Sequence, residues 1–133
     1  MTRAAAFLTI LALVGCGTAC TQETVVDLGA EITLAPGATA SVSGTALTVR
    51  FVAVTEDSRC PVDVTCIWAG EVKVQLEVKV SLVASEMTLR EGDSAVAGVY
   101  RVTLLRVEPR PASSGRIAAR DYRATLKVEK ASR

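Results

Sequence analysis

The feature that most constrains this chain is an uninterrupted alternation of apolar and polar residues from position 72 to position 82. Valine or leucine occupies every even position of this run, and a polar residue occupies every odd one. Successive side chains of a β-strand point to opposite faces of a sheet, whereas a helix repeats about every 3.6 residues and would spread the valines around its axis. The run therefore predicts a long β-strand with one face in the core and the other in water.

Shorter segments with the same alternation lie on both sides of this run. Turn sequences that contain glycine or proline, such as residues 35–38 and 91–93, separate them. In one segment Leu105 continues the apolar pattern of Leu104 in the opposite phase, which predicts a β-bulge there. The apolar residues that mark these shorter strands are Val25, Ile32, Leu34, Ala40, Val42, Leu47, Val49, Phe51, Ala53, Met87, Leu89, Tyr100, Val102, Leu104, Tyr122, Ala124, Leu126 and Val128.

Seven or eight such strands, with no amphipathic helical segment between them, predict an all-β fold. We expect an antiparallel β-sandwich, immunoglobulin-like or similar, because most strands have one polar face and the core residues are small. A small β-barrel is the alternative. The chain has 133 residues and half of them are apolar, which is enough for one core. Residues 25–133 are therefore predicted to form a single β domain.

The first residues predict a targeting signal. Arg3 precedes an apolar run of about ten residues, which is too short for a membrane-spanning helix and suits a signal peptide. The run ends in Leu-Val-Gly-Cys at positions 13–16, which resembles a bacterial lipobox. That resemblance implies that residues 1–15 are cleaved off as a lipoprotein signal peptide and that Cys16 carries the lipid. Residues 16–24 are then a short polar tether.

An ordinary secretory signal is the alternative interpretation, and Cys20 is a weaker candidate for the modified cysteine. Both signals place the mature chain outside the cytoplasm. Two or three acyl chains on Cys16 would anchor it stably to the membrane. Gly17 stands where lipoproteins of the inner membrane often carry aspartate, so the resemblance implies the outer membrane if the cell has two. Cys20 would then be an odd thiol, which is free or pairs between molecules.

Composition excludes several classes of function. The chain has no histidine, which removes the usual general base, the commonest metal ligand and every Ser-His-Asp or Cys-His site. Its four cysteines lack the paired CxxC spacing of zinc sites. Without Arg3 the mature chain carries 14 basic and 14 acidic residues, so charge gives no reason to expect nucleic acid or anionic lipid as a partner. We therefore predict no catalytic residue, metal or cofactor.

The rarest residue types gather in one loop, residues 56–71, just before the long strand. It holds two of the four cysteines and the only tryptophan. Because the mature chain lies in an oxidising setting, Cys60 and Cys66 are predicted to form a disulfide. In the chain-entropy model, closing so short a ring stabilises the fold by about 2 kcal/mol. Its larger effect is to fix the conformation of the loop, which Pro61 also stiffens.

Two interpretations of the tryptophan in this loop stay open. Trp68 either packs against the edge of the core or the disulfide, or it is an aromatic anchor for a partner. Four carboxylates lie in the same loop, but they lack the close spacing of calcium-binding loops, so we expect them to be solvated. The candidate binding loop is defined by Asp57, Arg59, Pro61, Trp68 and Gly70.

The pattern Asp-Ser-Arg-Cys-Pro, four residues, then Cys-x-Trp-x-Gly spans residues 57–70 and is followed by the valine-rich strand. It resembles a signature of small uncharacterised bacterial secreted proteins and lipoproteins. The resemblance extends over residues 51–82 and includes Ser58 and Ala69. It implies membership of that group, and it carries no activity, substrate or fold.

The sequence thus favours a membrane-anchored extracytoplasmic lipoprotein without enzymatic activity. It would act as a binding or structural module of the cell envelope, with the membrane and an unknown envelope protein as its partners. The alternative is a protease inhibitor of the secreted type that presents residues 60–66 to a protease. A loop that is already fixed loses less entropy when it binds, which suits either role.

Overall fold

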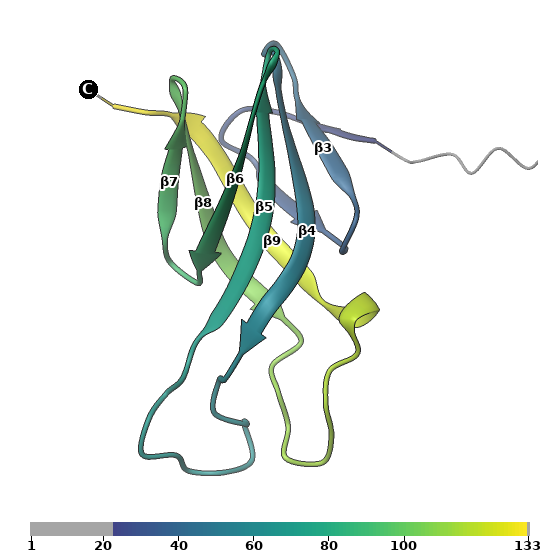
Figure 1. Ribbon diagram of the computed structural model, residues 1–133, viewed down its shortest axis with the longest axis vertical. Coiled ribbons are helices and arrows are strands. Elements are labelled where there is room, and N and C mark those ends of the chain that lie inside the picture. The colour runs from purple at the N-terminus through teal and green to yellow at the C-terminus, as the bar shows by residue number, and fades with distance from the viewer. Residues whose placement is uncertain (1–22, 133) are drawn as a thin grey trace, which may run out of the picture.

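The computed structural model describes residues 23–132 of the chain (Figure 1). They form two packed sheets that are not closed into a barrel, so the predicted all-β sandwich is confirmed and the barrel alternative is wrong. The predicted signal peptide, Cys16, Cys20 and most of the predicted tether lie outside the described residues. The elements are β1 (Thr24–Val26), β2 (Glu31–Leu34), β3 (Thr39–Val42), β4 (Leu47–Asp57), β5 (Val72–Val80), β6 (Val83–Arg90), β7 (Ser94–Ala97), β8 (Tyr100–Glu108), the 3-10 helix η1 (Ala119–Asp121) and β9 (Arg123–Lys130).

One sheet has the strand order β1-β3-β4-β5-β6, and the other has the order β2-β9-β8-β7. Every pair is antiparallel except β1 with β3, which is parallel. The expectation of a purely antiparallel sandwich is therefore wrong at this edge. The chain leaves the first sheet after β1, forms β2 in the second sheet, and returns as β3 in the same direction as β1.

The alternating run forms β5, in the interior of the five-stranded sheet between β4 and β6. The strand ends at Val80, two residues earlier than the alternation predicts, because Ser81 and Leu82 form the turn into β6. Ser81 has a φ of 56° and the Leu82 side chain is 92% exposed. A two-residue hairpin with positive φ at its first central position matches the twist of the strands it joins.

Bulges explain the places where alternation breaks. The predicted bulge near Leu104 is confirmed, since the register between β8 and β9 shifts between Leu104 and Arg106. Strand β4 has two further shifts, between Phe51 and Ala53 and between Val54 and Glu56. After the first shift Val54 packs against the core. This is why β4 shows apolar residues on both faces in the sequence.

The core lies between the sheets and consists mainly of valine, leucine and alanine, as the composition predicts. Strand β7 and the helix η1 were not predicted, because both are short and carry small or charged residues. No helix of residues 23–132 is long and apolar enough to cross a membrane. The fully buried large side chains are Phe51, Ile32, Leu34, Leu47, Leu76, Leu104, Leu126, Val42, Val49, Val72, Val74 and Val78.

Candidate functional site

Two long loops lie at the same end of the sandwich, at the bottom of Figure 1. The cysteine loop, residues 58–71, joins β4 to β5. The proline loop, residues 109–122, joins β8 to β9 and contains η1. The Val62 amide donates to the Pro111 carbonyl at 3.0 Å. Asp63 accepts hydrogen bonds from the amide of Ser113 at 2.9 Å and from its hydroxyl. The two loops therefore support each other.

The base of the cysteine loop continues the ladder between β4 and β5. The Ser58 amide donates to the Glu71 carbonyl at 2.8 Å, and the Cys60 amide donates to the Ala69 carbonyl at 2.9 Å. Beyond these bonds the sulfurs of Cys60 and Cys66 lie at disulfide distance, and their Cα atoms are 5.9 Å apart. The predicted disulfide is present, and it closes the ring that carries the far part of the loop.

A buried arginine attaches the cysteine loop to the proline loop. The Arg59 side chain donates two bonds of 2.8 Å to the carboxylate of Asp57. It also donates to the carbonyl of Val107 at 2.7 Å and to that of Pro109 at 3.1 Å. Arg59 is only 7% exposed. A buried guanidinium is stable only when its donors are satisfied, so these bonds fix the loop base firmly.

The carboxylate of Asp57 also accepts a hydrogen bond from the Tyr122 hydroxyl at 2.9 Å. Burial opposes the ionisation of Asp57, but the hydrogen bonds from Arg59 and Tyr122 outweigh it and lower the pKa of the carboxyl. Burial and the bond to Asp57 raise the pKa of Tyr122 to about 12. We call Asp57, Arg59 and Tyr122 the Arg59 cluster. Its geometry keeps the aspartate charged and the phenol neutral, which is the arrangement of a structural ion pair.

Gly70 is part of this base because no other residue fits its position. Its φ is +68°, and a Cβ built on it would lie 1.8 Å from the Ser58 carbonyl oxygen. The strands approach each other closely here, at the point where the chain returns from the loop into β5.

The far part of the cysteine loop carries apolar side chains in water. Ile67 is 94% exposed and Trp68 is 83% exposed, and Val62 and Val64 are exposed as well. We call these four residues the loop tip. The interpretation that Trp68 packs against the core or the disulfide is wrong, because such packing would cover most of its ring. Exposed aromatic and aliphatic side chains on a fixed loop are typical of a binding surface.

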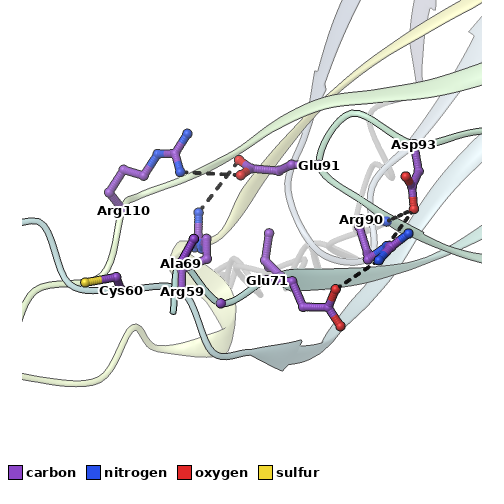
Figure 2. Close-up of a pocket in the computed structure, with 10 residues that line it drawn as sticks. Arg59, Cys60, Ala69, Glu71, Arg90, Glu91, Asp93 and Arg110 are labelled. Atoms are coloured by element: carbon purple, nitrogen blue, oxygen red, sulfur yellow. Dashed lines mark hydrogen bonds and ion pairs between the residues drawn. The ribbon is translucent and has the colours of Figure 1, made fainter. Parts of the chain in front are cut away.

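A cleft of about 370 Å³ lies beside the loop base, between the cysteine loop and the turn after β6 (Figure 2). Arg90 is paired with Glu71 at 3.3 Å and with Asp93 at 2.9 Å. Arg110 is 3.4 Å and Arg59 3.8 Å from the carboxylate of Glu91. Each arginine that lines the cleft thus has a carboxylate beside it, so the cleft offers little free charge to a ligand.

A second cleft, of about 400 Å³, lies between the two loops. Pro61 is half-buried there, opposite Pro111 and Ile117. Tyr122 also lines this cleft, and its hydroxyl is already bonded to Asp57. Pro61 therefore belongs to the contact between the loops and not to the exposed tip.

The five predicted loop residues consequently separate into three groups. Asp57, Arg59 and Gly70 hold the base, Pro61 lies between the loops, and among the five only Trp68 presents a large side chain to solvent. Of the four carboxylates expected to be solvated, Asp57 is largely buried against Arg59. The others are exposed or partly exposed, as expected, and each also has a partner: Glu56 pairs with Lys73, Asp63 with Ser113, and Glu71 with Lys73 and Arg90.

Sequence reasoning missed Ile67, Val62 and Val64 at the tip and Tyr122 in the base. The three apolar residues carried a usable signal. Val62 and Val64 alternate with polar residues inside a ring too short to have a core of its own, and Ile67 directly follows that ring. No sequence signal indicated the role of Tyr122, because it lies 65 positions from its partner Asp57.

No family model matches this chain, and neither a curated protein nor a solved structure shows significant similarity to it.

Proposed function

We propose that this protein is a non-enzymatic binding module held outside the cytoplasm by a lipid on Cys16, and that its loop tip binds a protein of the cell envelope. The observation that carries the proposal is the exposure of Ile67 and Trp68, at 94% and 83%, on a loop fixed at its base. Tryptophan buries a large area at low entropic cost and is enriched among residues that dominate binding energy. A fixed loop loses little further freedom on binding.

Site-specific photo-crosslinking in the producing bacterium tests this function. A photoreactive phenylalanine analogue replaces Ile67 in one variant and Leu82 in the other. Leu82 is a matched control because it is 92% exposed but lies beyond the opposite end of β5. We expect a discrete adduct from position 67, none of the same mass from position 82, and loss of the adduct when Trp68→Ser is added. Equal adducts from both positions would contradict a specific tip partner.

Lipid attachment is tested separately by metabolic labelling with palmitate. Cys16→Ser should abolish the label, and Cys20→Ser should retain it. Labelling that survives Cys16→Ser would refute the anchor at Cys16 and leave the binding role of the tip untouched. The two parts of the proposal can therefore fail independently.

Protease inhibition is the second candidate function. The observation that favours it is the position of Ile67, which directly follows the disulfide and is almost wholly exposed, as a side chain that enters a protease pocket must be. An inhibitor should slow at least one protease of a panel that covers the serine, cysteine and metallo classes. Ile67→Asp should then abolish the inhibition, whereas Leu82→Asp should not. Turnover unaffected across the panel would eliminate this candidate.

A further inference from the structure

The strand β6 is an open sheet edge. Of the four edge strands in residues 23–132, β6 has eight residues, whereas β1, β2 and β7 have three or four. Its ladder with β5 runs from Val83 to Arg90 without a register shift. Proteins commonly protect exposed edges with short strands, bulges, proline or charged side chains, above all lysine. Strand β6 is long, regular and free of proline and lysine, and its charged residues are Glu86 and Arg90.

The backbone of β6 presents unused donors and acceptors. The turn at Ser81 and Leu82 makes Val80 and Val83 a hydrogen-bonded pair. Hydrogen-bonded and non-hydrogen-bonded pairs alternate along an antiparallel ladder. The even-numbered residues 84–90 of β6 therefore point their N–H and C=O groups away from β5. Arg90 uses its outward groups on Asp93. Within the described part of the chain, no backbone partner takes the outward groups that remain, which belong to Ala84, Glu86 and Thr88.

The outer face of this edge carries two acidic side chains without an ion-pair partner in the described part of the chain. Its cations are Lys79, which stands opposite Ala84, and Lys73 and Arg90 at the far end, which are paired with other carboxylates. Glu86 stands directly opposite Glu77 on β5, in a pair that is not hydrogen-bonded and therefore closely spaced. Like charges in such a pair repel each other. Neither glutamate forms an ion pair among residues 23–132, and Glu86 only accepts a bond of 3.4 Å from the Gln75 amide. A cation on an added strand would relieve the repulsion.

The inner side of the same edge is apolar except at Ser85, and it is partly uncovered. Val83, Met87 and Leu89 lie on the core-facing side of β6, and Val83 is 67% exposed. The turn after β7 lies close by, since a Cβ on Gly98 would be 3.6 Å from the Val80 side chain. The labels β6 and β7 mark this side of the sandwich in Figure 1. Apolar residues of an added strand would cover Val83.

We propose that β6 binds an extended segment of a partner protein, which joins the five-stranded sheet as an outer strand. The segment places apolar side chains over Val83 and a lysine or arginine opposite Glu86. This inference is independent of the function proposed for the loop tip. A second copy of this chain fits less well. If the β6 strands of two copies pair in the antiparallel direction, the register that joins Ala84 of one copy to Thr88 of the other places the two Glu86 side chains opposite each other, and they repel.

Two synthetic nine-residue peptides test the proposal on the full chain. Valine alternates with threonine in both, and the central threonine is replaced by lysine in one and by glutamate in the other. We expect the labelled lysine peptide to bind in an anisotropy titration and the glutamate peptide to bind about fivefold more weakly, as a cross-strand charge pair predicts. Glu86→Lys should reverse the order of the two peptides.

A backbone variant tests whether the edge itself binds. Thr88→Pro removes one outward N–H and no bond to β5, and should weaken the lysine peptide at least tenfold, whereas Thr88→Val should bind it as the parent does. If Thr88→Pro does not fold, the peptide preference of Glu86→Lys still tests whether β6 is the binding site. The proposal is overturned if the lysine peptide does not bind, if Glu86→Lys leaves the preference unchanged, or if folded Thr88→Pro binds normally. Self-association that Glu86→Lys alters would make a second copy the occupant and would also overturn it.

Discussion

The base and the tip of the cysteine loop lie a few residues apart and differ in almost every physical respect. At the base, Arg59 is 7% exposed and its guanidinium is bonded to a carboxylate and two carbonyls of other segments. At the tip, Ile67 and Trp68 are almost fully exposed. The difference teaches that the polar residues of this loop hold it in place, while its apolar residues are available to a partner. This reverses the usual distribution between interior and surface.

Replacing the central arginine of the base gives the largest expected effect. Arg59→Ala leaves Asp57 charged and partly buried and frees two carbonyls, so we expect a loss of about 4 kcal/mol in the free energy of unfolding. Urea unfolding followed by circular dichroism measures it. Arg116→Ala in the proline loop is the matched control, because its side chain is exposed, and it should change stability by less than about 0.5 kcal/mol. Equal effects of the two substitutions would show that the base is not fixed by Arg59.

The next largest effect belongs to Gly70. A side chain here combines a left-handed φ of +68° with a contact of 1.8 Å to a backbone oxygen, so Gly70→Ala should cost about 3 kcal/mol. Gly115→Ala in the proline loop is the control, since a Cβ there meets nothing within 4 Å. Thermal unfolding of both variants measures the contrast. A neutral Gly70→Ala would mean that the strands at the loop base can separate freely.

The charge of Asp57 gives a smaller effect that depends on pH. Its folded pKa is lowered below the ordinary value of 3.8, so its contribution to stability is present above that value and is lost as pH falls through the folded pKa. Asp57→Asn should therefore destabilise by about 2 kcal/mol at neutral pH, and the difference from the parent should shrink below pH 3.8. Urea unfolding at several pH values measures this convergence. A difference that is constant across the acid range would assign the effect to shape and not to charge.

The sequence predicted much of the fold because the alternation of β5 and the turn residues are local signals. The disulfide was also predictable, since it joins residues six positions apart in a loop expected to lie outside the cytoplasm. The Arg59 cluster was not predictable. Its bonds reach from Arg59 to Val107 and Pro109, 48 and 50 positions away, and only the packing of the two sheets brings these segments together. An Asp-x-Arg triplet looks the same in sequence whether it is solvated or buried.

The exposure of Trp68 was undecided for a related reason. Tryptophan is usually well buried, and its position beside a cysteine suits both packing against the disulfide and contact with a partner. The two outcomes differ only in the direction in which the loop leaves the sandwich. The base determines that direction, and the base was the part that sequence patterns could not show.

The smallest expected effect on stability is at the tip, and it completes the contrast with the base. Trp68→Ser and Ile67→Ser should each change the free energy of unfolding by less than about 0.5 kcal/mol, because both side chains stay exposed to water in the folded protein. Trp68 is the only tryptophan, so its fluorescence reports on the tip alone. We expect a spectrum typical of a water-exposed indole that unfolding in urea barely shifts. A clear red shift on unfolding, together with a destabilised Trp68→Ser variant, would show that the ring is packed in solution, and the tip would then belong to the same structural unit as the base.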